Sequence, residues 1–265
     1  MSREHRLRFL ASVTVAVCTV IFVQEPIPQD PCYHEFADQR GFLGLPHALN
    51  VATNLFFLLV GAIGLVRIFC WSRGEGTAFE NPVEAIPYAA LCIGLILTGF
   101  GSAYYHIAPD TDRLFWDRLP MSIAFMAYLV TAITERIDRR TGVGAVFPLI
   151  AYGVFSVLYW RLTEQSGSGD LRYYLLAQLM PLILVPLMVW LLPSPYTRGR
   201  DLFVVTGLYM LAKALEIADA FVYDLGRIIS GHSLKHIAAA GAALWILRML
   251  QKRAPAPTNE GQQLP

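Results

Sequence analysis

Long apolar stretches, separated by short polar connections, run along almost the whole chain. A helix needs about 20 apolar residues to cross roughly 30 Å of hydrocarbon, because each residue advances it by about 1.5 Å. Stretches of this length predict eight spanning helices, near residues 7–23, 46–69, 84–105, 119–135, 143–160, 172–192, 202–222 and 232–250. The pattern therefore predicts an all-α, multi-pass integral membrane protein.

Composition supports a membrane protein and excludes some other classes. The chain is 55% hydrophobic and 15% charged, whereas soluble domains contain about 25% charged residues. Its net charge of +1 leaves no basic excess for a nucleic-acid partner, and nothing in the sequence indicates a protein partner. The four cysteines lack the CxxC spacing of thiolate metal sites, and most lie in or beside apolar stretches. Neither a disulfide framework nor a thiolate site is predicted.

The first and last parts of the chain differ from the rest. Three arginines precede the first apolar stretch, and no small-residue cleavage site stands before "QEPIPQD". Residues 1–29 are therefore a signal anchor, which we favour, or an atypical signal peptide. We expect residues 30–45 to form an extracytoplasmic segment. The polar, proline-containing tail 251–265 is predicted to be disordered and cytoplasmic.

Positive charges in the connections indicate an orientation. Short cytoplasmic loops are enriched in Lys and Arg. If the N-terminus is cytoplasmic, thirteen Lys and Arg residues fall on the cytoplasmic side and six on the other, with Lys213 and Lys235 inside predicted spans. This bias predicts that both termini are cytoplasmic if the first segment is retained.

Polar residues gather at the non-cytoplasmic ends of three predicted spans. Ser102 and His106 end the third span, Asp117 precedes the fourth, and His232 and His236 open the last. The topology places all five at one depth of the membrane. Ionisable groups at such positions are costly and are functional candidates.

The spacing of the histidines suits a metal ion. His232 and His236 are four residues apart, so they project from one helical face. With His106 they would supply three ligands and leave a fourth position open for water, as in catalytic zinc sites. Imidazole suits zinc, although iron, nickel and copper also accept it. A lone His-x3-His pair is more often structural, but the third histidine and Asp117 at the same depth favour a metal.

Other polar residues are interpreted as structural. We expect four of them to form local pairs in a solvated loop: Asp110, Asp112, Arg113 and Arg118. Glu216 and Asp219 could be partners of the histidines or form a buried pair with Lys213, and we favour the pair.

The stretch "GSAYYHIAPDTDRLFWDRLP" at 101–120, together with "SGHSLKH" near the last span, resembles the alkaline ceramidases and their bacterial relatives in the CREST superfamily of membrane hydrolases. The resemblance extends over roughly residues 30–250 and rests on the order and spacing of the three motifs. It implies a seven-helix transmembrane bundle at 46–250, preceded by the additional N-terminal hydrophobic segment.

The resemblance also implies a function. His106, His232 and His236 would bind Zn2+, Asp117 would transfer the proton of the attacking water, and Ser102 would stabilise the oxyanion. The substrate would be ceramide or another N-acyl lipid within the membrane, cleaved to a fatty acid and an amine. The active site would face the non-cytoplasmic side.

Several residues depart from the family pattern. Asp30, Glu35 and Asp38 could supply some oxygen ligands for calcium, but Pro31 and His47 replace a tryptophan and a glutamate of the family's calcium motif. The cysteine partner expected for Cys32 is missing, and Lys235 stands where an aromatic residue is usual.

Two other functions remain open from the sequence. An ester-cleaving lipid-remodelling hydrolase of the same superfamily would use the same residues. A seven-helix receptor or transport protein could use the histidines as a proton relay, although a transporter would be expected to show internal repeats.

Overall fold

The computed structural model describes residues 1–257 and shows an all-helical protein, with no β-strand in that range. Short helices α2 (Ala48–Ala52) and α9 (Asp219–Gly226) accompany eight long ones. The long helices are α1 (Arg3–Val23), α3 (Leu55–Ser72), α4 (Ala85–Ile107), α5 (Thr111–Arg136), α6 (Arg139–Gln165), α7 (Arg172–Leu191), α8 (Asp201–Ile217) and α10 (Gly231–Lys252). Each long helix overlaps one predicted apolar segment.

Within residues 1–257, five helical stretches are long and apolar enough to cross a membrane, as expected for a membrane protein. They are Arg3–Val23, Ala48–Ser72, Pro82–Ile107, Arg139–Gln165 and Arg172–Leu191. Helices α5 and α10 are also long enough, but α5 carries several charged residues and α10 carries both charged residues and histidines. Helix α8 has only 17 residues. The number of membrane crossings, and with it the seven-helix bundle, stays a prediction.

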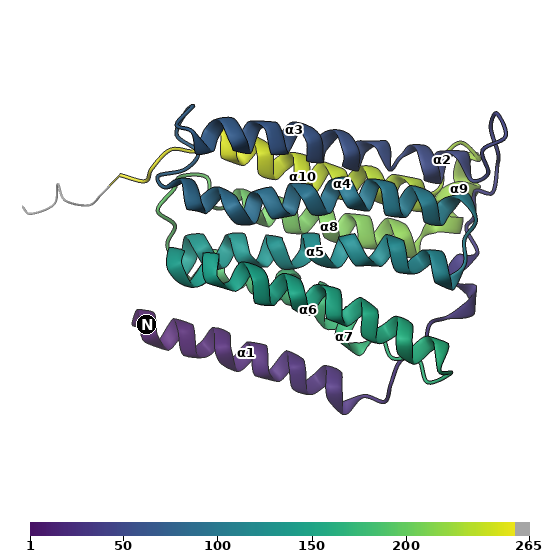
Figure 1. Cartoon of the computed structure of the whole chain (residues 1–265), viewed down its shortest axis with the longest axis horizontal. Coiled ribbons are helices and arrows are strands. Elements are labelled where there is room, and N and C mark those ends of the chain that lie inside the picture. The colour runs from purple at the N-terminus through teal and green to yellow at the C-terminus, as the bar shows by residue number, and fades with distance from the viewer. Residues whose placement is uncertain (258–265) are drawn as a thin grey trace, which may run out of the picture.

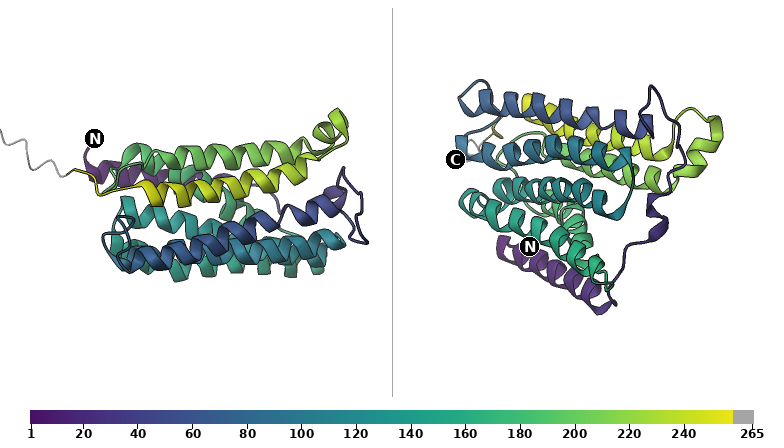
Figure 2. Two further views of the ribbon diagram at one scale, coloured as in Figure 1. Left: turned by 90° about the horizontal axis from the view of Figure 1, so that it is seen from above. Right: turned by 45° about the vertical axis from the view of Figure 1, so that its right-hand side comes forward.

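The long helices run side by side along the long axis of the molecule (Figure 1). Helix α4 packs between α3 and α5, α5 also packs on α6, and α8 packs on α10. Seen from above, α8 and α10 lie on one side of the bundle and α3 and α4 on the other (Figure 2). Helix α1 packs mainly on α7, where Arg6 donates a 2.7 Å hydrogen bond to the carbonyl of Leu191.

The two ends of the bundle carry different elements. The start of α1 and the end of α10 lie at one end, whereas the α4–α5 turn and the start of α10 lie at the other (Figure 1). The α4–α5 turn is shorter than the sequence suggests, because the side chain of Asp110 accepts a hydrogen bond from the backbone N–H of Arg113 and begins α5 at Thr111. This turn brings the end of α4 directly beside the start of α5.

Two glycines permit close helix contacts at that end. A Cβ atom on Gly101 in α4 would lie 2.0 Å from the carbonyl oxygen of Trp116 in α5. A Cβ atom on Gly231 would lie 2.2 Å from the carbonyl oxygen of Leu215 in α8. Both glycines directly precede candidate site residues, so they set how closely the helices that carry those residues approach.

The opposite end is closed by the first residues after α10. Arg253 is buried, forms an ion pair with Glu135 of α5, and lies with its guanidinium 3.9 Å from the ring centre of Tyr196. Ala256 donates a backbone hydrogen bond to Pro195. Of the tail predicted to be disordered, residues 251–257 are therefore held by specific contacts, while 258–265 lie outside the described residues.

Candidate metal centre and active site

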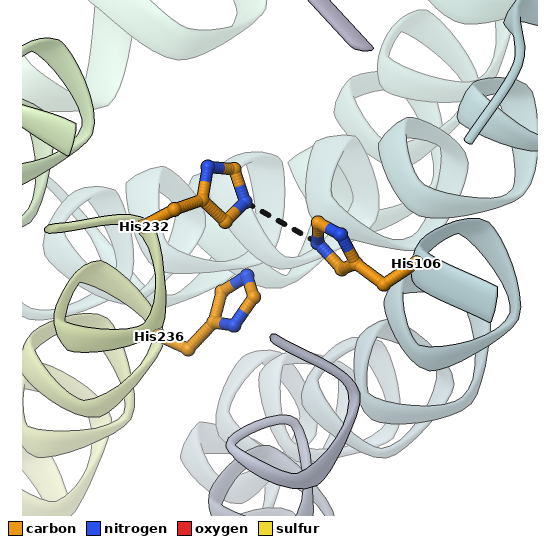
Figure 3. A group of neighbouring side chains, drawn as sticks. All are labelled: His106, His232 and His236. Carbon is orange, nitrogen blue, oxygen red and sulfur yellow. Dashed lines mark hydrogen bonds between the residues drawn. The ribbon is translucent and has the colours of Figure 1, made fainter. Parts of the chain in front are cut away.

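Three histidines meet at the end of the bundle that carries the α4–α5 turn. His106 lies in the last turn of α4, and His232 and His236 lie in the first turns of α10, with the three rings close together (Figure 3). The Nε2 atoms of His106 and His232 are 3.2 Å apart, and one ring nitrogen from each of the three lies within 4.8 Å of the others. All three side chains are buried. Within residues 1–257 they are the one such cluster of potential metal ligands.

Local interactions fix the start of α10, which carries two of these histidines. The side chain of Ser230 accepts a hydrogen bond from the backbone N–H of Ser233 and caps the helix. Asp219 accepts a 2.7 Å hydrogen bond from the backbone N–H of His232 through Oδ1. Two oxygens from outside the helix thus satisfy N–H groups of its first turn and set the position of His232.

A hydroxyl group defines which nitrogen of His236 is free. Thr53 Oγ1 lies 2.8 Å from the carbonyl oxygen of Leu49 and 2.9 Å from Nδ1 of His236. Because the hydroxyl hydrogen is donated to that carbonyl, the oxygen accepts a hydrogen from Nδ1–H. The Nε2 atom of His236 then carries a lone pair, the form that binds metals.

The donor set fits a divalent metal ion. Nitrogens bound at about 2.0–2.1 Å to a tetrahedral ion lie about 3.3 Å apart, close to the separation between His106 and His232. Without a metal, these two buried nitrogens have only each other as hydrogen-bond partner within residues 1–257, and Nδ1 of His106 is buried without any partner in that range. Buried polar atoms rarely lack a hydrogen-bond partner. A neutral three-imidazole site is suited to zinc or a similar ion.

Asp117 and Ser102 lie on the wall of the same cavity as His236. Both are buried, and the Ser102 side chain lies next to the Asp117 carboxylate. The rest of the cavity wall is mainly apolar and is contributed by α4, α5, α7, α8 and α10, with lining residues that include Leu95, Met121, Phe125, Leu182, Val205 and Ile246. The cavity thus joins a polar end, beside the histidines, to an apolar interior.

A segment that the sequence motifs did not assign to the site covers it. We call residues 30–47 the covering segment. The ring of Phe36 is 4% exposed, and its centre lies 4.7 Å from that of His106 and 4.4 Å from that of His232. His34 Nδ1 lies 2.9 Å from the hydroxyl of Tyr105, and Asp219 Oδ2 accepts a 2.9 Å hydrogen bond from the N–H of Ala37. Phe36 therefore separates the histidine cluster from solvent.

The surroundings of His34 alter its protonation. Burial of the ring, together with the positive charge of nearby Arg118, lowers the pKa of His34 below its ordinary value. The neutral imidazole is thus favoured in the covering segment.

Arg118 does not lie in a solvated loop, and that prediction is wrong. The side chain is 5% exposed, and its guanidinium packs against the rings of Trp160, Tyr174 and Tyr33 at 4.4, 5.0 and 5.2 Å from their centres. Helix α5 begins earlier than expected, which turns Arg118 into the bundle. The other three loop residues form exposed or half-exposed pairs, Asp110 with Arg113 and Asp112 with Arg161.

Glu216 pairs with Lys213, the arrangement that we favoured, but it also pairs with Lys235 from the turn between the two histidines of α10. Asp219 has a different role, because its two carboxylate oxygens accept the backbone hydrogen bonds of His232 and Ala37. The spacing of these residues did not reveal the link between α8 and α10.

The acidic residues considered for calcium do not gather at one place. Asp38 is bound by Arg40 at 2.8 Å, and Asp30 accepts a hydrogen bond from the backbone of Cys32. In residues 1–257 they join no cluster of three potential ligands. Cys32 is exposed and, like the other three cysteines, free.

Comparison with known proteins identifies the family. No curated protein matches the chain closely enough to be counted as a relative. A family model described as Ceramidase matches residues 46–250. This range runs from α2 into the last turn of α10 and contains the three histidines, Asp117 and Ser102. This match spans most of the chain and agrees with the resemblance seen in the motifs, so the protein belongs to the Ceramidase family.

Proposed function

We propose that this protein is a zinc-dependent integral-membrane amidohydrolase that cleaves ceramide or a related N-acyl lipid to a fatty acid and a free amine. The observation that carries the proposal is the convergence of three buried imidazoles beside a cavity whose wall also bears Asp117 and Ser102. Membership of the Ceramidase family supports the same reaction.

In this proposal His106, His232 and His236 hold the metal. When bound, a zinc ion would lower the pKa of its water to about 7, which supplies the strong nucleophile that an amide requires, and it would also polarise the carbonyl group. The apolar part of the cavity accepts the acyl chain, and the polar end holds the amide. The covering segment keeps bulk water from the reacting groups through Phe36.

Asp117 is the proposed proton carrier. Its carboxylate accepts a proton from the attacking water while the oxygen of that water adds to the carbonyl carbon. The same carboxyl group then gives the proton to the nitrogen as the C–N bond breaks, so that a neutral amine leaves. The hydroxyl of Ser102 donates a hydrogen bond to the carbonyl oxygen as negative charge develops there.

The proposed orientation follows from the charges in the loops. Both termini would face the cytoplasm, and the histidine cluster would lie toward the non-cytoplasmic face. The start of α1 and the end of α10 lie at the same end of the bundle, opposite the α4–α5 turn (Figure 1), which agrees with an even number of crossings.

Purified protein and a lipid panel test the proposal. The panel contains N-acyl and O-acyl lipids, with released fatty acid measured by mass spectrometry, and metal content is measured in the same preparation. We expect about one zinc per chain and release from N-acyl lipids, with both lost in His232→Ala. Asp117→Asn should keep the metal but lose most activity. Folded protein without metal, or release only from O-acyl lipids, would reject the proposed reaction.

A further inference from the structure

The polar end of the cavity holds a cluster of lysines that the reaction itself does not require. Lys213, Glu216 and Lys235 all line the cavity that contains Asp117 and His236. Lys235 lies between His232 and His236 in sequence, on α10, while Lys213 and Glu216 come from the neighbouring helix α8. The cluster therefore stands beside the place where the amide is held.

The carboxylate of Glu216 accepts hydrogen bonds from two ammonium groups in this cluster. Glu216 Oε2 accepts from Lys213, and Oε1 accepts from both Lys235 and the hydroxyl of Tyr33. An ammonium group has three N–H donors, and each lysine gives one of them to Glu216. The side chain of Lys235 is only 14% exposed and lines the cavity, so little of it meets open solvent.

A third cation, Arg118, lies behind the cavity wall without a carboxylate partner within residues 1–257. On the wall itself Lys213 and Lys235 balance Glu216 and Asp117. Arg118 stacks on two tyrosines of the wall, forms no ion pair among the described residues, and its Nη1 atom is buried there without a hydrogen-bond partner. A buried cation without a paired anion is costly, and an anionic ligand held at this end would lower that cost.

We infer that the substrate carries a negatively charged headgroup on the amine side of the scissile amide, recognised by Lys235 and Lys213. The inference that such a substrate is hydrolysed rests on the proposed function. The preference for binding an anionic headgroup does not depend on it. The apolar interior suits the acyl chain, so the headgroup is the part of the substrate left at the polar end. A carboxylate or a phosphate would provide the required anionic oxygens.

A matched pair of substrates tests the inference. N-oleoylglycine and N-oleoylethanolamine have the same acyl chain and the same amide. The first carries a carboxylate where the second carries a hydroxymethyl group. We expect the protein to hydrolyse the carboxylate compound with a kcat/KM about tenfold higher or more. Ceramide 1-phosphate and ceramide form a second pair, and the pair with the larger ratio shows whether carboxylate or phosphate is the preferred anion.

Variants assign the preference to the lysines. Lys235→Met should lower kcat/KM for N-oleoylglycine more than for N-oleoylethanolamine, so that the ratio within the pair moves toward one, and Lys235→Arg should retain the ratio. Lys213→Met, at a side chain that is 41% exposed, gives a second test if Lys235→Met does not fold. Lys252→Met at the far end of α10 is the matched control and should change nothing. A ratio near one in the unaltered protein, or one that both lysine variants leave unchanged, overturns the inference.

A binding measurement separates this inference from the proposed reaction. Affinities of metal-depleted protein for the two N-oleoyl compounds are measured by the quenching of tryptophan fluorescence. A preference for N-oleoylglycine that Lys235→Met abolishes, without hydrolysis of any lipid by the zinc-loaded protein, would reject the reaction and keep the anionic headgroup. Hydrolysis of N-acyl lipids without a preference for N-oleoylglycine would keep the proposed reaction and reject the anionic headgroup.

Discussion

The hydroxyl of Thr53 lies 2.9 Å from Nδ1 of His236 and occupies that nitrogen, which leaves Nε2 of the imidazole to bind a metal. Groups that orient a ligating histidine in this way typically affect metal affinity by about 10–100-fold. Thr53→Val should therefore weaken zinc binding by a factor in this range, measured by competition with a chromophoric chelator. Thr53→Ser keeps the hydroxyl and should bind zinc nearly as well. Equal affinity in Thr53→Val would show that His236 is oriented by packing alone.

Phe36 should control how fast a bound metal leaves. Replacing it with alanine removes a buried ring that contacts His106 and His232, at a cost of about 3 kcal/mol. If the covering segment must open before the metal can leave, this loss of stability corresponds to a roughly 100-fold larger population of the open segment. Phe36→Ala should then release zinc to excess chelator faster by up to that factor. Phe42→Ala, at a side chain that is 69% exposed in the same segment, is the control and should leave the rate unchanged.

Gly101 should tolerate no side chain. The added Cβ would meet a backbone oxygen of Trp116 at 2.0 Å, which cannot move without separating α4 from α5. Gly101→Ala should destabilise the protein by about 1–3 kcal/mol or more, seen as a lower midpoint of thermal unfolding in detergent. A Cβ atom added to Gly144 in α6 would have no neighbour within 4 Å, so Gly144→Ala should be neutral or stabilising. An equal effect of the two changes would contradict the close helix contact.

The covering segment should loosen in acid. The hydrogen bond from the Arg40 side chain lowers the pKa of Asp38 below its usual value, which is near about 3.9 for an aspartate. A carboxyl group whose pKa is lower in the folded state adds stability above its unfolded pKa, and this is lost as the pH falls through the folded value. Protease digestion of the segment should therefore accelerate below about pH 4.

A variant isolates the contribution of this carboxyl group. Asp38→Asn should digest faster than the unaltered protein at neutral pH, and the difference between the two should shrink as the pH falls below about 4. A difference that stays constant from neutral to acidic pH would exclude Asp38 as the titrating group.

Replacing one partner of the buried Arg253–Glu135 ion pair should destabilise the protein more than replacing both. Loss of one partner leaves a buried charge and typically costs about 3–5 kcal/mol, whereas apolar replacement of both is often nearly neutral. Glu135→Leu should lower the thermal midpoint clearly, and Glu135→Leu with Arg253→Met should recover much of the loss. No recovery would indicate that contacts of Arg253 with the carbonyl of Ala78 and the ring of Tyr196 dominate.

The sequence predicted the elements that have periodic or compositional signals. The eight apolar stretches correspond to the eight long helices, and the spacing of His232 and His236, combined with alternating topology, correctly implied that His106 would lie near them. Helix length and direction suffice for such a prediction, because every second connection between successive helices lies at the same end of the bundle.

Contacts made by irregular segments could not be predicted in the same way. The covering segment has no periodic pattern, so nothing in the sequence indicated that Phe36 would pack on the histidines. Arg118 was misplaced because one capping residue, Asp110, lengthened α5 and turned the side chain inward. The first residues of the tail are polar, yet the charge of Glu135 holds Arg253 in the bundle.

Asp219 connects two parts of the site through a single carboxylate, with Oδ2 bound to the covering segment and Oδ1 to the backbone of His232. We therefore expect closure of the segment and binding of a metal at the histidines to be linked equilibria. If closure tightens metal binding by a given factor, then metal binding must favour closure by the same factor. The apoprotein and the metal-loaded protein would thus differ in how readily the cavity admits a lipid, as well as in their capacity for chemistry.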